Sequence, residues 1–291
     1  MVSVGMITYN HEQYIAQAIE GVLMQKTNFN YELVIGEDCS IDDTAKIILE
    51  YTTKHPVIIV PLCSYKNRGM IPNFLITLEK CKGKYFSFCE GDDYWTDPYK
   101  LQKQVDFLEA NNEYGLCYGD IIVVNDDDSL LSQDPSWKDL YKSGYVFNDL
   151  FIQNFIPTLT VVVRKEFLDS ACKTLKSFPD LKLFDYWFWL YISMFTKFKY
   201  FNEKLAAYRD HAQGITESKE FNKENFLVMV NQIKINIIEN YCNISKSKKI
   251  VPGIKEKLSL MKKAIQLFYM TPDILLSGRA KLKCLFKVLI S

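Results

Sequence analysis

The sequence predicts an α/β fold, with a mostly parallel sheet flanked by helices and a helical region at the C-terminus. Strand-like and helix-like patterns alternate through the first half of the chain, which is typical of parallel strands joined by crossover helices. Polar turns follow three of these strands, at the edge where open α/β sheets bind ligands. From about residue 217 onward only helical periodicity is visible.

The first half of the chain predicts four strands separated by helices. Each strand is a short, largely apolar run that ends in polar turn residues. The strands are expected at residues 2–7, 31–36, 57–62 and 85–89. Asn10 is a candidate cap of the first helix, and Ser40-Ile41-Asp42-Asp43 resembles a capping box at the start of the second.

The second half is less regular and is expected to complete the same domain. A helix over residues 99–111 has Leu101, Val105 and Leu108 facing inward, and residues 115–125 are apolar and strand-like. Further strands are expected at residues 159–164, 198–202 and 205–208. We therefore expect one α/β domain over residues 1–216, with halves at about 1–97 and about 98–216, and a separate helical region over residues 217–291.

Composition narrows the expected partners and the compartment. The 291 residues carry 35 Lys and Arg against 35 Asp and Glu, so a basic surface for nucleic acid is not expected. The eight cysteines form no Cys-x-x-Cys pair, which favours reduced thiols over a zinc or redox motif. No secretory signal and no apolar run of membrane-spanning length is visible, so we expect a cytoplasmic protein.

Three polar turns are expected to share one crevice at the sheet edge. They are Thr8-Tyr9-Asn10 after the first strand, Glu37-Asp38-Cys39-Ser40 after the second, and Gly91-Asp92-Asp93 after the fourth. Adjacent carboxylates at the end of a strand, next to a small residue, suit a hard divalent cation, which usually brings phosphates with it. The alternative for an Asp-Asp pair in a loop is a solvated turn.

These separated motifs agree in order and spacing with family 2 of the glycosyltransferases, which the chain resembles over roughly residues 2–215. The resemblance implies the GT-A fold, a Rossmann-like and mostly parallel sheet flanked by helices. It also implies an inverting, metal-dependent hexosyltransferase that moves a sugar from a nucleoside-diphosphate sugar to a glycan hydroxyl or a lipid-linked acceptor. The expected donor is a UDP-sugar, and the expected setting is bacterial surface polysaccharide synthesis.

The resemblance assigns the nucleoside to the first two turns. In the family, the turn that matches Thr8, Tyr9 and Asn10 and the acidic turn that matches Glu37 and Asp38 bind the donor, with Asp38 at the base. A carboxylate can accept a hydrogen bond from an imide N–H such as that of uracil. The alternative is that both acids start the following helix and favour its dipole.

Two later segments also match donor-binding positions of the family. Asn73 falls where the family usually has Ala-Arg-Asn, but Ile71-Pro72 stands in place of the arginine, so that cationic contact is lost. Tyr208-Arg209-Asp210-His211 resembles a Tyr-Arg-x-His segment, in which Arg209 binds the donor and His211 reaches the metal or the diphosphate. The alternatives are a plain helix start at Asn73 and a structural hydrogen bond at His211.

Asp92 and Asp93 match the metal motif of the family. Asp93, together with His211, is expected to hold Mn²⁺ or Mg²⁺, and Asp92 is expected to bind the donor. A cation in this position bridges the two donor phosphates and neutralises the leaving nucleoside diphosphate, which is Lewis-acid assistance.

Acceptor chemistry is assigned to the segment around residue 185. Asp185 matches an acid that precedes an aromatic helix in the family and deprotonates the acceptor hydroxyl; the alternative is an N-cap. Trp95 and Trp187 are candidates for stacking on acceptor sugars, with core packing as the alternative.

Three alternatives concern the chain as a whole. Residues 279–290 mix basic and apolar side chains, which suits peripheral membrane contact at the inner face of the plasma membrane or a packing helix with a solvated lysine face. A sugar-nucleotide pyrophosphorylase is disfavoured because Thr8-Tyr9-Asn10-His11 is not a glycine-rich phosphate loop. A non-catalytic nucleotide-sugar-binding subunit is disfavoured because Asp93 and Asp185 are both present.

Overall fold

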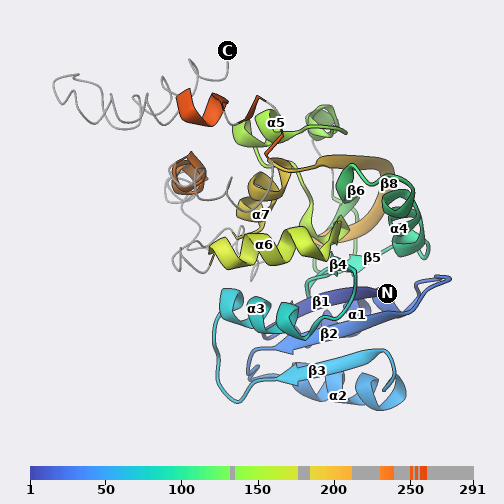
Figure 1. The fold of residues 1–291 in the computed structure, drawn as a ribbon. Helices are drawn as coiled ribbons and strands as arrows, with labels where there is room; N and C mark the ends of the chain where they lie inside the picture. Colours follow the sequence, from blue (N-terminus) through green and yellow to red (C-terminus); the bar gives the residue numbers. More distant parts are fainter. Residues whose placement is uncertain are drawn as a thin grey trace.

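The computed structural model describes residues 1–131, 135–175, 184–211, 230–238, 250–251, 253–254 and 256–260. These residues form an eight-stranded mixed sheet with helices packed against it (Figure 1). The strand order is β3-β2-β1-β4-β7-β6-β8-β5. This architecture confirms the predicted α/β fold.

Strands and helices alternate along most of the described chain. The strands are β1 (Val2–Thr8), β2 (Tyr31–Glu37), β3 (Ile59–Cys63), β4 (Tyr85–Phe88), β5 (Tyr94–Trp95), β6 (Tyr114–Val124), β7 (Val162–Arg164) and β8 (Lys197–Arg209). The α-helices are α1 (Ile15–Leu23), α2 (Thr44–Lys54), α3 (Met70–Lys80), α4 (Lys100–Ala110), α5 (Phe147–Ile152), α6 (Lys165–Leu175) and α7 (Phe184–Ser193). Two 3₁₀ turns are η1 (Pro135–Leu140) and η2 (Thr158–Thr160).

The parallel half of the sheet brings the first polar turns together. β1 lies between β2 and β4, with Val4 opposite Leu33 on one side and Ser87 on the other, and β3 extends the sheet beyond β2. Because these strands run in the same direction, the turns that follow them meet at one edge. β7 runs antiparallel to β4 and β6, while β6 and β8 are parallel to each other.

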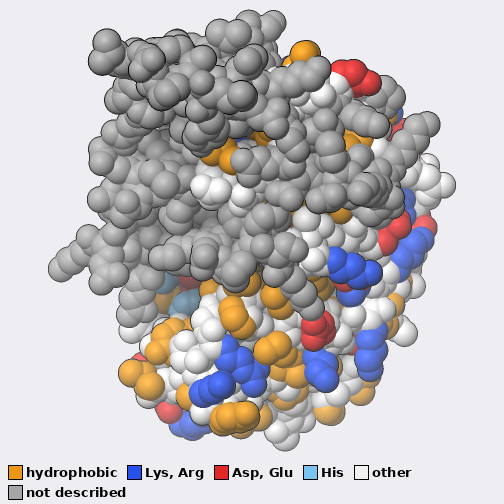
Figure 2. Space-filling model, turned by 60° about the vertical axis from the view of Figure 1, so that its left-hand side comes forward, with side chains coloured by type: hydrophobic (Ala, Val, Ile, Leu, Met, Phe, Trp, Pro, Cys, Tyr) orange, Lys and Arg blue, Asp and Glu red, His pale blue; other side chains and the backbone are white. Residues whose placement is uncertain are grey.

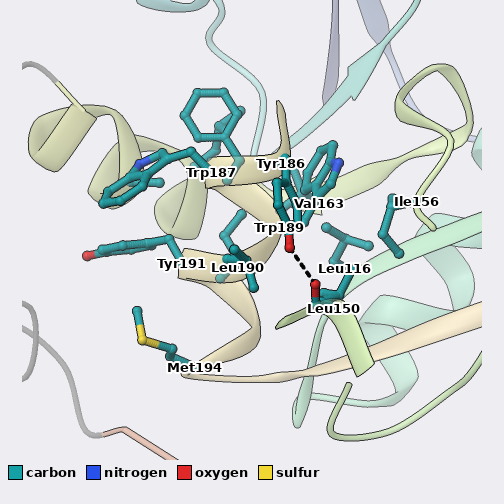
Figure 3. Packing of buried hydrophobic residues seen from close by; sticks show 14 of the residues in the cluster. Leu116, Leu150, Ile156, Val163, Tyr186, Trp187, Trp189, Leu190, Tyr191 and Met194 are labelled. Carbon is teal, nitrogen blue, oxygen red and sulfur yellow. Dashed lines mark hydrogen bonds between the residues drawn. The ribbon is translucent and has the colours of Figure 1, made fainter. Parts of the chain in front are cut away.

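Side chains of each strand alternate between two apolar cores on opposite faces of the sheet. Leu33 and Ile35 of β2 pack in one core with residues of α1, α2 and α4, whereas Val34 packs in the other with residues of α3, α5, α6 and α7. Every residue of α7 except Asp185 is buried, as expected of a helix that is apolar all round. Figure 3 shows its packing, with the Tyr186 hydroxyl donating to the carbonyl oxygen of Leu150 at 2.7 Å.

Several local predictions differ from the structure. Residues 159–164 were expected to form one strand, but Thr158–Thr160 form the turn η2 and β7 begins at Val162. Asn10 is not a helix cap, because α1 begins at Ile15 and Asn10 adopts a positive φ of 57° in the preceding turn. Asp43 is the N-cap of α2 but makes no side-chain cap hydrogen bond, so the expected capping box is not formed. The two strands expected at residues 198–202 and 205–208 form one strand, β8, whose pairing with β6 shifts around Asp120.

The described parts of the predicted C-terminal helical region pack against the domain. Residues 230–238 are helical, and Ile233, Ile237, Ile254 and Leu258 belong to the same buried cluster as α7. Residues 279–290, the expected site of membrane contact, lie outside the described residues. Within the described ranges, every helix is too short or too polar to span a bilayer. On the face drawn in Figure 2, acidic, basic and apolar side chains are interspersed over the described surface.

Candidate active site

The turns after β1 and β2 are bonded to each other. The backbone N–H of Asn10 donates to the Ser40 hydroxyl at 2.9 Å, and the Asn10 side-chain oxygen accepts from the N–H of Ile41 at 3.0 Å. Asparagine tolerates the left-handed backbone that this exchange requires. The buried Glu37 carboxylate accepts the N–H of Ser40 at 2.6 Å. Two turns that were predicted to hold one nucleoside therefore form one continuous surface.

Asp38 and Asn73 hold the segment after β3 against β2. The two Asp38 carboxylate oxygens accept the backbone N–H groups of Arg68 and Gly69 at 2.9 and 2.8 Å. The Asn73 side chain donates to the carbonyl oxygen of Gly36 at 2.8 Å. Both side chains are buried, and each carboxylate oxygen has a second lone pair. The expected contact between Asp38 and a base thus stays a prediction.

Gly91 allows the turn after β4 to approach the turn after β1. A Cβ atom at Gly91 would lie 2.6 Å from the Thr8 hydroxyl oxygen and 3.1 Å from Nδ1 of His11. The Thr8 hydroxyl and His11 Nδ1 are buried and have no hydrogen-bond partner in the described part of the chain. The close approach therefore leaves polar atoms of both turns available next to Asp92.

Asp92 faces two histidines. Its Oδ2 lies 3.2 Å from Nε2 of His211 and 3.7 Å from Nε2 of His11. Burial acts to raise the pKa of Asp92, but the hydrogen bond with His211 and the charges of both imidazoles outweigh it and lower this pKa. Burial also lowers the pKa of His11. Because the pKa of Asp92 is lowered, its carboxylate stays charged at neutral pH.

Asp93 points elsewhere. Its Oδ1 accepts the backbone N–H of Arg209 at 2.9 Å, and the residue is 5% exposed. Burial, together with Asp92 and Glu90, raises the pKa of Asp93 well above its usual range. Burial, together with Asp92 and Asp185, raises the pKa of Glu90 to about 8, and the Oε2 atom of Glu90 is buried without a partner among the described residues.

The end of β4 thus gathers more acids than nearby cations. Among the described residues, however, no three His, Cys, Asp or Glu side chains are grouped so as to hold a metal ion by themselves.

The guanidinium group of Arg209 is hydrogen-bonded to other residues of the chain. Its Nε donates to the carbonyl oxygen of Asp92 at 3.1 Å, and its two terminal nitrogens donate to the carbonyl oxygen of Asn125 at 3.0 Å and to Asp128 at 2.8 Å. A further bond goes to the Gln17 side chain at 2.5 Å. Through these contacts Arg209 joins the turns after β4 and β6. Few of its N–H groups then remain for the contact with the sugar donor that was expected from the sequence.

Asp185 lies in the first turn of α7. The helix begins at Phe184, so Asp185 does not occupy the N-cap position that was the alternative to a catalytic role. Its Oδ2 accepts the Thr158 hydroxyl at 3.1 Å. Burial raises the pKa of Asp185, against the hydrogen bonds from the Tyr186 backbone and Thr158. Because its charge also raises the pKa of Glu90, Asp185 lies near the acids at the end of β4.

Comparison with known proteins identifies the fold and the family. Residues 3–170 match the sequence model of "Glycosyl transferase family 2", which is more than half of the chain. The chain belongs to this glycosyltransferase family. It is 34% identical over 230 residues to an uncharacterized protein of Mycobacterium tuberculosis, in a match that covers 77% of this chain and 63% of that relative. It therefore spans less than two thirds of the length of its mycobacterial relatives.

Other relatives and structural neighbours of this family member include proteins named as sugar transferases. It is 29% identical over 192 residues to a glucosyltransferase of Escherichia coli, "UDP-Glc:alpha-D-GlcNAc-diphosphoundecaprenol beta-1,3-glucosyltransferase WfgD", covering 66% of this chain and 69% of that enzyme. A structure of S. aureus TarS with UDP-GlcNAc has a TM-score of 0.62 at 15% identity and covers 100% of this chain and 81% of that one. A Pyrobaculum calidifontis mannosyltransferase with GDP-Man and Mn²⁺ has a TM-score of 0.58 at 14% identity, covering 90% and 68%.

Trp95 and Trp187 belong to the core of the glycosyltransferase domain. Trp95 is 1% exposed, and its indole N–H donates to the carbonyl oxygen of Leu159 at 2.9 Å. Trp187 is fully buried beside Tyr191, with ring centroids 6.1 Å apart (Figure 3). Because neither ring reaches the surface, we do not carry forward the expected stacking on acceptor sugars.

His11 is the site residue that sequence reasoning missed. The chain has only three histidines, and His11 directly follows the Thr8-Tyr9-Asn10 turn. Since β1 pairs with β4, a histidine after β1 lies next to the carboxylates after β4. A rare imidazole next to a motif turn was the signal available in the sequence. Tyr9, in that turn, is 42% exposed and so is accessible to a ligand.

Proposed function

We propose that this family member is an inverting, metal-dependent glycosyltransferase that transfers a sugar from a UDP-sugar to a hydroxyl of a glycan or lipid-linked acceptor. The setting proposed is bacterial surface polysaccharide synthesis. The observation that carries the proposal is the excess of acids where the turn after β4 meets Asp185, beside the joined turns after β1 and β2. In this proposal the acids at the end of β4 bind a cation, the joined turns bind the nucleoside, and Asp185 is the base.

The side chains at the end of β4 fit a divalent ion such as Mn²⁺ or Mg²⁺. Two ligand atoms at right angles, each about 2.1 Å from an ion, lie about 3 Å apart. Asp92 Oδ2 and His211 Nε2 are separated by 3.2 Å, and the unpartnered Glu90 carboxylate supplies further negative charge. We assign the ion to Asp92 and His211 rather than to Asp93, because Asp93 is bonded to the backbone of Arg209.

The chemistry supplied by such an ion is charge neutralisation on the leaving diphosphate. Ions of this kind are held by one or two carboxylates and complete their coordination with substrate phosphates. Asp92 is suited to this task because its pKa is lowered, so that its carboxylate is charged at neutral pH.

The nucleoside is proposed to lie on the joined turns, against Thr8, Tyr9, Asn10, Glu37 and Asp38. Asp38 is proposed to accept from the imide of uracil with a lone pair that Arg68 and Gly69 leave free. Uridine is supported by the E. coli enzyme, which is named for UDP-Glc, and by the structure of TarS in complex with UDP-GlcNAc. The mannosyltransferase bound to GDP-Man makes guanosine the competitor to test.

Asp185 is proposed to take the proton of the acceptor hydroxyl as the sugar leaves its diphosphate. In an inverting transfer a single base acts on the face opposite the leaving group. The carboxylate suits the role because it keeps lone pairs free beyond the bond from Thr158.

The test of this function is a product screen. The purified chain is incubated with UDP-glucose, UDP-GlcNAc, UDP-galactose and GDP-mannose, with Mn²⁺ or with chelator, and mixed glycan and lipid-linked acceptors. Mass spectrometry is expected to find a glycosylated product and free UDP with Mn²⁺ only. Products formed equally well in chelator would contradict the ion, and faster use of GDP-mannose would contradict the donor class.

A further inference from the structure

The side-chain partner of Asp185 lies on a short turn that precedes β7. Thr158 is the first residue of η2, and its hydroxyl donates to Asp185 Oδ2 at 3.1 Å. Twenty-seven positions separate the two residues in sequence, so the contact depends on the fold. The sequence did not predict that Thr158 contacts Asp185.

The turn that carries Thr158 is fixed from several sides. The indole N–H of Trp95, which follows the Asp92-Asp93 turn, donates to Leu159 at 2.9 Å and to Phe88 at the end of β4 at 3.3 Å. The Gln104 side chain of α4 donates to the carbonyl oxygen of Thr160 at 2.9 Å. The N–H of Gly119 in β6 donates to the Thr160 hydroxyl at 3.0 Å.

These bonds tie the Thr158 turn to the strand that ends in the acidic turn. Trp95 is shared between Leu159 of η2 and Phe88 of β4, and all of its ring is buried. Because these bonds hold the backbone of the turn in place, the turn presents the Thr158 hydroxyl from a fixed position.

The Asp185 carboxylate needs such a donor. Its backbone is held in α7 between the buried Phe184 and Tyr186, but its side chain can still rotate. The backbone N–H groups of Tyr186 and of Asp185 itself also favour the charged carboxylate, but they belong to the same helix, whereas Thr158 supplies a donor from another element. Losing that donor gives the side chain more freedom to rotate, and catalysis requires one near-attack geometry. A bond to Oδ2 selects one rotamer and leaves Oδ1 free of this donor.

We propose that Thr158 is a positioning residue for the base Asp185, holding the carboxylate so that its other oxygen meets the acceptor hydroxyl. The proposal rests on the proposed function, in which Asp185 takes the acceptor proton. The competing explanation is structural: the threonine methyl group fills space in the turn, and its hydroxyl only satisfies a partly buried carboxylate. The two explanations predict opposite effects for two conservative variants.

The test compares Thr158→Val, which keeps the shape and removes the hydroxyl, with Thr158→Ser, which keeps the hydroxyl and removes the methyl. The readout is release of nucleoside diphosphate from UDP-glucose and UDP-GlcNAc with Mn²⁺ and the same mixed glycan and lipid-linked acceptors as in the product screen. Thr158→Val is expected to lower kcat by roughly tenfold with KM for the donor unchanged. Thr158→Ser is expected to stay within about twofold of the parent, since its hydroxyl can make the same bond. A parental kcat in Thr158→Val, or an equal loss in both variants, would overturn the proposal.

Asp185→Asn and the double variant separate this inference from the proposed function. If Asp185 is the base, adding Thr158→Val to Asp185→Asn causes no further loss. A parental rate in Asp185→Asn would refute the base itself, whereas a deep loss there with a parental rate in Thr158→Val would refute only the positioning role. No release from either UDP-sugar by the parent would count against the proposed function.

A second readout needs no turnover. Carboxyl-labelled aspartate is followed by ¹³C NMR as pH changes, with Asp185→Asn used to assign the Asp185 signal. A donated hydrogen bond favours the charged carboxylate, so Thr158→Val is expected to raise the pKa of Asp185 and Thr158→Ser to leave it unchanged. Among the described groups, Glu90 is the acid whose titration is linked to Asp185, and it is unlabelled in this experiment. An unchanged pKa in Thr158→Val would contradict the proposal.

Discussion

Asp92 and Asp93 are adjacent in sequence, but only one of them faces the imidazoles. Asp92 lies 3.2 Å from His211, whereas Asp93 accepts the backbone N–H of Arg209. The sequence motif contains both acids and cannot say which one turns toward the site. That choice depends on Arg209, which follows 116 positions later in the chain.

The two acids are therefore expected to respond differently to neutralisation. Asp92→Asn is expected to weaken Mn²⁺-dependent binding of UDP by roughly 10–100-fold, because a charged ligand is lost. Asp93→Asn is the matched control: its amide oxygen can still accept the backbone N–H of Arg209, so binding is expected to change little. Calorimetric titration of UDP with Mn²⁺ measures both. A larger loss of UDP binding in Asp93→Asn than in Asp92→Asn would instead assign the ion to Asp93.

Lys100 is a buried base whose effect on stability depends on pH. Its side chain is fully buried, donates to the Ser87 hydroxyl at 3.0 Å and lies 4.1 Å from the centre of the Trp95 ring. Burial lowers the pKa of Lys100 to about 7, below the unfolded value of about 10.4. Between these values the unfolded chain binds more protons, so the contribution of Lys100 to stability rises with pH.

Lys100→Met is expected to remove this pH dependence. Relative to the variant, the free energy of unfolding of the parent should be higher at pH 9.5 than at pH 7 by roughly 2–3 kcal/mol. Urea unfolding of both proteins at the two pH values measures the difference, in which other titrating groups cancel. Parallel pH profiles for parent and variant would show that Lys100 titrates normally.

At the scale of elements, the strands of the parallel half were predictable because each is a short apolar run closed by polar residues. β2 was expected at residues 31–36 and is observed at Tyr31–Glu37. Local capping was less predictable: Asn10 resembles a helix cap in sequence but instead bonds the neighbouring turn through Ile41 and Ser40. β5 is two residues long and was not predicted, since so short a strand leaves no periodic pattern.

Trp95 in β5 joins η2 to β4, which predicts its effect on stability. Trp95→Phe keeps an aromatic ring but leaves the carbonyl oxygens of Leu159 and Phe88 without this donor, at a cost of about 1–3 kcal/mol. Trp189→Phe is the matched control, because Trp189 is also fully buried but its indole N–H has no hydrogen-bond partner among the described residues. Both variants lose similar ring volume, so urea unfolding should find Trp95→Phe less stable than Trp189→Phe. Equal losses would mean that the Trp95 hydrogen bonds contribute nothing beyond packing.

At the scale of the whole molecule, the sheet order decides which turns become neighbours. β1 lies between β2 and β4, so the turns after these strands share one edge, as alternating strands and helices had indicated. The contact between Thr158 and Asp185 was not predictable, because the two residues meet only through long-range packing. Long-range packing was also not predictable in the C-terminal region. Its helical periodicity gave no sign that Ile233 and Leu258 would pack in the same buried cluster as α7.

The central claim is that Asp185 is the base of a sugar transfer whose donor is bound elsewhere in the site. Asp185→Asn keeps the size of the side chain and an oxygen that can accept from Thr158, but cannot take a proton at neutral pH. The decisive measurement is the transfer rate of this variant with Mn²⁺ and the UDP-sugar that the parent uses fastest, alongside its affinity for UDP and its Tm. We predict a fall in rate of roughly 10²–10⁴ with UDP affinity and Tm unchanged. A transfer rate near that of the parent would contradict the account.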